Sequence, residues 1–163
     1  MKIVVMSDSH GDIMTVRKII SAHKDASIFI HLCDGEKDIE TVRDENPLLT
    51  IYNVAGNCDI DRYSSYTPTS KVIKARAVNM NIFICHGHNY SIKTTYGEII
   101  EYSLKNECKI AMFGHTHKPY EGYKRNIFLF NPGSCSRYNE SGISYGIIYI
   151  DNLGNISSEI RDI

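Results

Sequence analysis

The first third of the chain alternates between largely apolar runs and amphipathic stretches. The apolar runs have the length of strands and little alternation, as expected for strands covered on both faces; they occupy residues 2–7, 26–32 and 48–55. Between them, residues 12–24 and 36–44 carry apolar side chains at helical spacing, and Asp12 is placed to cap the first helix. The order β-α-β-α-β predicts parallel strands joined by helical crossovers, which is an α/β fold.

The remainder of the chain predicts one further helix among short strands. Strands are predicted at residues 71–77, 82–85, 109–113, 120–124, 127–130, 143–150 and 156–160, and an irregular loop at 59–69. The first two of these strands form a hairpin. Ser91 can cap a helix that runs to about Asn106, with Tyr96 and Leu104 among its inward residues. The later strands predict an antiparallel part of a second sheet, and we expect one domain over residues 1–163.

Composition and charge narrow the classes of function. Hydrophobic residues make up 42% of the 163 residues and charged residues 23%, which is ordinary for a globular domain. The net charge is 18 minus 19, or −1, so we expect no specific nucleic-acid partner and no attraction to anionic membranes, although a local basic patch remains open. The apolar run at residues 3–6 is too short for a signal peptide and no window is long enough to span a membrane. We therefore expect a cytoplasmic protein.

The cysteines form an odd set without a Cys-x-x-Cys pair. They stand at positions 33, 58, 85, 108 and 135. Such spacing favours reduced thiols over a disulfide framework or a structural zinc site. Cys85 and Cys108 fall in apolar runs and are expected to pack as small core residues.

Polar residues follow directly after five of the predicted strands. They are Asp8, His10, Asp34, Asn57, His86, His115 and His117. In open α/β sheets, ligands bind at the carboxyl ends of the strands. Taken one at a time, several of these residues also fit ordinary turns, and Asn57 in particular could simply hold the turn after Gly56. The repetition at strand ends favours a shared site.

The chemistry of this set points to two transition-metal ions. Carboxylate, imidazole and amide groups form a mixed oxygen and nitrogen set that suits Mn, Fe, Zn, Ni or Co better than Ca or Mg. Seven ligands are too many for one ion that keeps a position open for water, but they fit two ions bridged by a carboxylate. Two such ions about 3.5–4 Å apart recur in enzymes that hydrolyse phosphoesters.

The motifs that carry these residues resemble a known family. Asp8-x-His10, Cys33-Asp34, Gly56-Asn57-Cys58-Asp59, His86-Gly87-His88 and Gly114-His115-Thr116-His117 resemble, in order and spacing, the five motifs of the calcineurin-like metallophosphoesterase superfamily. The short chain and the later Asn131-Pro132-Gly133-Ser134 are similar to its small bacterial and archaeal phosphodiesterase branch. The resemblance covers nearly the whole chain and implies a four-layer α/β/β/α sandwich of two mixed sheets.

The resemblance also implies roles for the seven residues. Asp8, His10 and His117 would bind a first metal, Asp34 would bridge, and Asn57, His86 and His115 would bind a second. The implied activity is a metal-dependent phosphodiesterase that acts on a small phosphoester through a metal-bridging hydroxide, with Mn favoured as the metal. Two alternatives stay open: a phosphomonoesterase or nucleotide hydrolase on the same site, and a protein-interaction scaffold of the same fold. A homo-oligomer is also left open.

Two positions depart from the family pattern. Cys33 stands where the family usually has a glycine before the bridging aspartate. Cys58 stands where many relatives carry a histidine thought to protonate the leaving group, and a thiol matches that task less well near neutral pH. We expect Cys58, with Asn57, to lie on the leaving-group side of the substrate, and His88 to lie near the substrate.

Some polar residues fit structural roles better than roles in the site. Asp38 and Glu40 are expected on a solvated helix face. Arg137 could contact a phosphate or lie in a loop, and the loop is favoured. His23 and His31 have no motif around them, so we interpret them as packing or surface residues.

Overall fold

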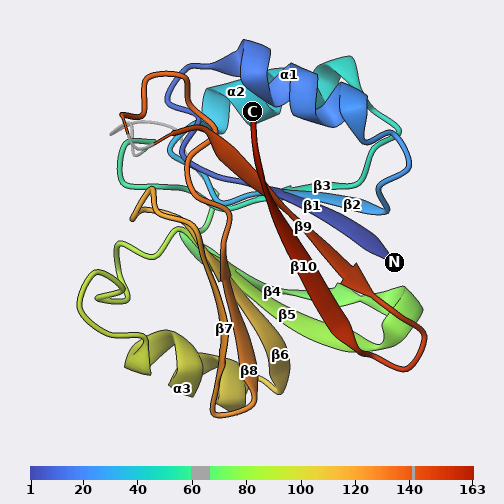
Figure 1. Cartoon of the computed structure of the whole chain (residues 1–163), viewed down its shortest axis with the longest axis vertical. Coiled ribbons are helices and arrows are strands. Elements are labelled where there is room, and N and C mark those ends of the chain that lie inside the picture. The colour runs from blue at the N-terminus through green and yellow to red at the C-terminus, as the bar shows by residue number, and fades with distance from the viewer. Residues whose placement is uncertain (60–66, 141) are drawn as a thin grey trace.

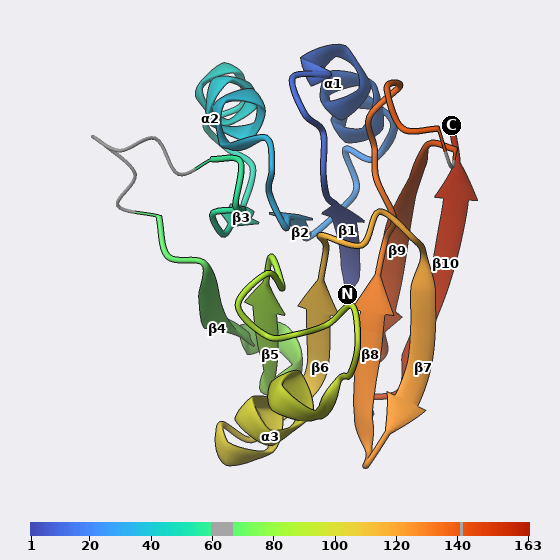
Figure 2. The ribbon, with the colours of Figure 1, turned by 90° about the vertical axis from the view of Figure 1, so that its left-hand side faces the viewer.

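Two five-stranded mixed sheets lie face to face in the computed structural model of the chain, with helices on both outer surfaces (Figures 1 and 2). The structure describes residues 1–59, 67–140 and 142–163. Most of the loop predicted at 59–69 therefore lies outside the described residues. The arrangement confirms the predicted α/β/β/α sandwich.

The first sheet has the strand order β10-β9-β1-β2-β3. Its strands are β1 (Lys2–Met6), β2 (Ile28–His31), β3 (Ile51–Asn53), β9 (Ser144–Ile150) and β10 (Ile156–Asp162). The first three run parallel, β9 runs antiparallel to β1, and β10 runs antiparallel to β9. Helices α1 (Ile13–Ala22) and α2 (Glu36–Glu45) are the crossovers between the parallel strands and lie side by side on the outer face (Figure 2).

The second sheet has the strand order β4-β5-β6-β8-β7. Its strands are β4 (Ser70–Ala75), β5 (Met80–Cys85), β6 (Cys108–Phe113), β7 (Tyr120–Lys124) and β8 (Ile127–Asn131). The central strands β5, β6 and β8 run parallel, and the edge strands β4 and β7 run antiparallel to their neighbours. Helix α3 (Gly97–Lys105) joins β5 to β6 on the outer face (Figure 2).

Three apolar layers hold these elements together. Between the sheets, Ile3 and Ile30 of one sheet pack in the same cluster as Ile84 and Met112 of the other. Each sheet sends the alternate side chains to its own helices, as strand geometry requires: Val4 and Phe29 to α1 and α2, and Phe83 and Ala111 to α3, in two separate clusters. Because the strands are covered on both faces, their sequences are apolar without alternation, which is the pattern from which they were predicted.

The helix predicted from Ser91 begins later than expected. Ser91 has a φ of 51°, in the left-handed region, and its carbonyl accepts hydrogen bonds from the N–H groups of Thr94 and Thr95. These residues form turns, and α3 begins only at Gly97. Leu104, predicted to face inward, is 38% exposed. The predicted hairpin is present, but a short 3₁₀ turn at Arg76–Val78 ends β4 two residues early.

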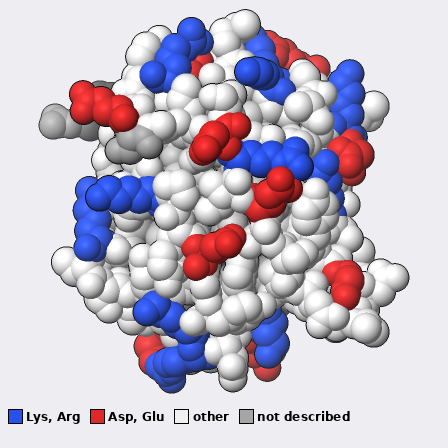
Figure 3. Space-filling view, viewed as in Figure 1, with Lys and Arg blue, Asp and Glu red and all other residues white. Residues whose placement is uncertain are grey.

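Acidic and basic side chains are interspersed on the face drawn in Figure 3. Neither sign forms a continuous stripe on that face, in keeping with the net charge of −1. Among the described residues, no helix is long and apolar enough to cross a membrane.

His23 and His31 are both buried, so packing is the correct interpretation of the two offered. His23 lies just after α1, where its Nδ1 is 3.1 Å from Lys2 Nζ and its Nε2 is 2.9 Å from the hydroxyl of Tyr145. Because an ammonium group can only donate, Nδ1 must accept and Nε2 must carry the proton. Burial and the Lys2 charge both lower the pKa of His23.

This neutral histidine predicts an acid-sensitive fold. A group whose pKa is lower in the folded than in the unfolded chain contributes stability above its unfolded pKa, and the contribution is lost as the pH falls. We expect the urea-unfolding free energy to fall between pH 7 and pH 5.5, and to fall less steeply in His23→Gln. The exposed Lys24→Gln serves as the control and should keep the wild-type dependence. Equal slopes in His23→Gln and the wild type would contradict the prediction.

Candidate metal centre

The turns after five strands interlock at one end of the sandwich. Backbone hydrogen bonds join the turn after β1 to that after β2, through Asp8 N–H and the Cys33 carbonyl, and the turn after β6 to that after β5, through Gly114 N–H and the His86 carbonyl. The two sheets meet here as well, because His86 Nδ1 lies 2.8 Å from the carbonyl oxygen of Leu32. The carboxyl ends of parallel strands from both sheets therefore share one edge, as predicted.

The first group of candidate ligands gathers around Asp8. Oδ1 of this buried carboxylate lies 3.2 Å from His117 Nε2, and His117 Nε2 lies 3.2 Å from His10 Nε2. One ligand atom from each of the three residues lies within 4.8 Å of the others. The other oxygen of Asp8 accepts hydrogen bonds from Ser7 Oγ at 2.5 Å and from His115 N–H at 3.1 Å. The hydrogen bonds to Oδ2 fix the carboxylate so that Oδ1 faces the two imidazoles.

The second group gathers around Asp34 and His86. Asp34 Oδ2 lies 3.3 Å from His86 Nε2, and His86 Nε2 lies 3.1 Å from Asn57 Oδ1. Asp34 also joins the first group, because its carboxylate lies within 4.8 Å of ligand atoms of both Asp8 and His86. Asp34 thus stands between the two groups, which is where a bridging ligand must stand.

The two histidines of the Gly114–His117 turn face different groups. His117 contacts Asp8 and His10, whereas the ring centroid of His115 lies 5.1 Å from that of His86. The ring centroid of His88 lies 5.3 Å from that of His86. The buried Nδ1 of His88 has no hydrogen-bond partner among the described residues. All seven predicted ligands therefore lie at one place, with His88 beside them.

Cys58 also lies at the centre, on the side formed by the turn after β3. Its side chain is exposed, and its sulfur lies within 4.8 Å of ligand atoms of His10 and Asp34. Its backbone N–H donates to Asp34 Oδ1 at 2.7 Å, and its sulfur lies 3.4 Å from Asn57 Nδ2. Cys58 therefore lies beside Asp34 and Asn57; its position on the leaving-group side of a substrate stays a prediction.

Left-handed backbone conformations concentrate at the candidate ligands. Among the described residues, eleven residues other than glycine have a positive φ. Six of them belong to these turns: Asp8, His10, Cys33, Asp34, His115 and His117. Such conformations are costly for residues with a side chain and cluster at functional sites. The φ of 58° at Cys33 is one that glycine adopts without strain, which fits the glycine expected at this position.

Asp59 holds the Asp34 turn in place, a role that the sequence interpretation missed. Its carboxylate accepts hydrogen bonds from the backbone N–H groups of Asp34, Gly35, Glu36 and Gly56, each at 2.8 or 2.9 Å. It thereby joins the turns after β2 and β3. The sequence signal that could have revealed this role is the position of Asp59 at the end of the Gly56–Asp59 motif.

The interpretation of Asp38 was wrong. The Asp38 carboxylate is buried, and it accepts hydrogen bonds from Ser9 Oγ at 2.7 Å and from Gly11 N–H at 2.9 Å. It holds the turn that carries Asp8 and His10, whereas Glu40 is exposed as expected. Helical periodicity could not reveal this, because the partners come from another strand end.

Further contacts support the turns after β1 and β6. Asp12 caps α1 as predicted, by accepting a hydrogen bond from Thr15 N–H, and it also pairs with the guanidinium of Arg137 at 2.5 Å. Arg137 lies in a loop, as predicted, but it has this structural partner. Ser134, in the turn after β8, donates from Oγ to the Asp8 carbonyl at 2.8 Å, and Asn131, the last residue of β8, donates from Nδ2 to the Gly114 carbonyl at 2.9 Å.

The electrostatics of the site favour a cation. Burial opposes ionisation of Asp34, but His86 and the hydrogen bonds from Cys58 outweigh it and lower its pKa well below the ordinary value. The Asp8 carboxylate raises the pKa of His117. Asp8 Oδ1 is buried, and no hydrogen bond reaches it from the described residues. Two adjacent buried carboxylates with imidazole nitrogens turned toward them are the donor set of a divalent transition-metal site, so these residues fit metal ions.

The family is decided by a comparison with known proteins. A family model described as the calcineurin-like phosphoesterase superfamily domain matches residues 1–153. The chain belongs to this superfamily. Membership places it among hydrolases that act on phosphoesters and implies divalent metal ions.

Curated relatives and solved structures agree with this assignment. The chain is 26% identical to a phosphodiesterase of Methanocaldococcus jannaschii, over 100% of this chain and 98% of that protein. It is 25% identical to phosphodiesterase YfcE of Escherichia coli, over 96% of this chain and 92% of that protein. A solved structure described as a predicted phosphoesterase from Streptococcus pneumoniae matches with a TM-score of 0.76 at 25% identity, over 98% of this chain and 97% of that chain.

Vps29 shares the fold. The structure of Vps29 from Entamoeba histolytica with Zn²⁺ matches with a TM-score of 0.72 at 18% identity, over 99% of each chain. At that identity the likeness extends to the fold alone.

The close packing of the turns after β2 and β3 makes Gly56 a sensitive position. A Cβ atom at Gly56 would lie 2.1 Å from Asp34 Oδ1 and 2.5 Å from Asp34 N, so Gly56→Ala must displace Asp34. We expect Gly56→Ala to weaken Mn²⁺ binding in calorimetric titration by at least about tenfold, the cost typical of disturbing a ligand's supporting contacts.

Gly97→Ala is the matched control, because its added Cβ would meet only Thr95 Oγ1 at an ordinary 3.5 Å. Its Mn²⁺ affinity should equal that of the wild type. A Gly56→Ala variant that is folded by circular dichroism and binds Mn²⁺ with wild-type affinity would show that Asp34 is not a ligand.

Proposed function

We propose that the chain is a phosphodiesterase that works with two divalent metal ions at the shared edge of its sheets. The observation that carries this proposal is the position of Asp34, whose carboxylate lies within 4.8 Å of ligand atoms of both Asp8 and His86. One carboxylate within reach of two ligand groups is the arrangement that a pair of bridged ions requires.

The ligand groups divide the proposed roles. Asp8, His10 and His117 hold one ion, and Asn57, His86 and His115 hold the other, with Asp34 shared. The contacts of His117 with His10 and of Asn57 with His86, at 3.2 and 3.1 Å, support this division. The nitrogen and oxygen donors favour Mn²⁺, with Fe, Zn, Ni or Co as further metals that such a set accepts.

When bound, the ions would act as Lewis acids toward phosphate oxygens and would bring the pKa of a bound water close to neutral. The residues of this chain hold and orient the reacting groups. Hydrogen bonds from Ser7 and Cys58 fix the two carboxylates, and Asp59 accepts a hydrogen bond from the backbone N–H of Asp34, so little reorganisation is needed when substrate arrives. Cys58 and His88 border the ligands, and we assign them, with the ligand Asn57, to the substrate side, with Cys58 toward the leaving group.

A non-catalytic scaffold of the same fold is the alternative from another class. The shared fold with Vps29 is the observation that supports this alternative. The donor set, in which all seven expected ligands are present, favours an enzyme. Relatives named phosphodiesterases support diesters over monoesters.

Asp34→Asn tests the proposal. The amide keeps the shape of the side chain and removes its charge, so it cannot hold two cations as a carboxylate does. With Mn²⁺, we expect the wild type to hydrolyse bis(p-nitrophenyl) phosphate faster than p-nitrophenyl phosphate, and Asp34→Asn to lose at least about a hundredfold in kcat/KM.

Glu40→Gln is the matched control, since Glu40 is exposed on α2. It should keep wild-type activity in the same preparation. Equal activity of Asp34→Asn and the wild type would refute the bridging role. Binding of Mn²⁺ without hydrolysis of any diester or monoester would favour the scaffold instead, and a preference for the monoester would favour a phosphomonoesterase.

Cys58→His tests the leaving-group side. An imidazole beside His10 and Asp34 adds a proton donor where the wild type has a thiol, so we expect the ratio of diester to monoester kcat/KM to change by about tenfold or more. Cys58→Ser removes the thiol without adding a base and should stay closer to the wild-type ratio. An unchanged ratio in Cys58→His would exclude contact between this side chain and the leaving group.

A further inference from the structure

A hollow opens directly beside the candidate metal centre, on the side of the second sheet. Its volume is about 530 Å³, and it is lined by Ile92, Lys93, Tyr96, Thr116, Lys118, Pro119 and Tyr120. Thr116 lies between the candidate ligands His115 and His117, and Lys118 follows them. The hollow therefore shares a turn with the metal centre, and its size is within the range of small-molecule sites.

Aromatic rings form a fixed wall of this hollow. The rings of Tyr96 and Tyr120 lie 4.9 Å apart, and that of Tyr96 lies 5.3 Å from the buried ring of Phe113. Neither tyrosine hydroxyl has a hydrogen-bond partner among the described residues. Rings held by packing offer a flat apolar surface and polar edges at low entropic cost.

The charged side chains that line the hollow are all basic. Lys93 and Lys118 are exposed, and neither forms an ion pair within the described part of the chain. A neighbouring hollow of about 450 Å³ shares Ile92, Lys93 and Tyr96 and adds Lys124, whose ammonium lies 5.7 Å from the ring centroid of Tyr96. No acidic residue lines either hollow among the residues described. An anion is the ligand that such a surface attracts.

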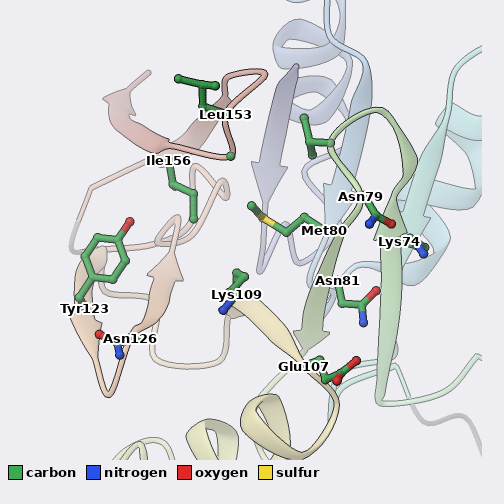
Figure 4. A pocket seen from close by; sticks show the side chains of 12 residues that line it. Lys74, Asn79, Met80, Asn81, Glu107, Lys109, Tyr123, Asn126, Leu153 and Ile156 are labelled. Carbon is green, nitrogen blue, oxygen red and sulfur yellow. The ribbon is translucent and has the colours of Figure 1, made fainter.

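Another hollow, of about 510 Å³, lies at the opposite end of the sandwich and has neither the aromatic wall nor the single sign of charge (Figure 4). It lies between the strands at Met80 and Ile156, and its two lysines, Lys74 and Lys109, share it with Glu107. None of its lining residues belongs to a turn that bears a candidate ligand. It offers a control position, Lys109, with the same charge but no route to the reacting phosphate.

We infer that the hollow beside the metal centre is a substrate subsite for a nucleotide arm that carries a second phosphate. The inference rests on the proposed function, in which the ions hold the reacting diester. The base lies against the wall of Tyr96 and Tyr120, and the second phosphate meets Lys93 and Lys118. The preferred substrates are then diesters of nucleoside bisphosphates, and diesters with uncharged arms react more slowly.

Two chromogenic substrates that differ only in the second phosphate measure its effect on kcat/KM. Thymidine 5′-(p-nitrophenyl phosphate) and its 3′-phosphorylated analogue release the same leaving group and differ in one phosphate. In low salt with Mn²⁺, we expect kcat/KM to be at least about fivefold higher for the phosphorylated analogue, and the preference to shrink as salt is added.

Charge-removing variants locate the effect. Lys93→Gln and Lys118→Gln should each lower the preference, and the double variant should bring it close to one. Lys109→Gln should keep the wild-type preference.

Failure of the inference is distinguishable from failure of the proposed function. Hydrolysis of bis(p-nitrophenyl) phosphate with no preference for the 3′-phosphate overturns the subsite and leaves the phosphodiesterase intact. A preference that survives in the double variant also overturns it. Absence of hydrolysis of every diester overturns both.

Discussion

The structure depends on one electrostatic constraint: Asp8 and Asp34 come together in the interior with little solvent to separate them. Asp8 is 0% and Asp34 3% exposed, and their carboxylates approach within 4.8 Å. Like charges so close and so dry repel unless a cation or protons compensate them. The fold nevertheless forces them together, through turns in left-handed conformations and through hydrogen bonds that orient each carboxylate. A divalent cation between the two carboxylates would remove this repulsion, as the proposed function requires.

Much of this could be predicted from the sequence, because the relevant signals are local. Strands covered on both faces read as continuous apolar runs, and the residue after each run falls at the carboxyl edge of a parallel sheet. The seven predicted ligands, Asn57 included, follow from that rule and lie together. The capping of α1 by Asp12 was equally local.

What could not be predicted depends on partners far along the chain. Asp38, on a helix face expected to be solvated, accepts hydrogen bonds from the turn after β1. Asp59 accepts hydrogen bonds from four backbone N–H groups in two turns. The helix predicted from Ser91 begins only at Gly97, because the sequence does not distinguish a serine in a left-handed conformation from a serine that caps a helix. The hollow beside His115 and His117 arises only when the start of β7 packs against the segment before α3.

Anomalous diffraction from crystals grown with Mn²⁺ tests the central claim most directly. Two peaks about 3.5–4 Å apart are expected, one on each side of the Asp34 carboxylate. The first should lie against Asp8, His10 and His117, and the second against Asn57, His86 and His115. A single peak, or two peaks that do not share Asp34, would contradict the account.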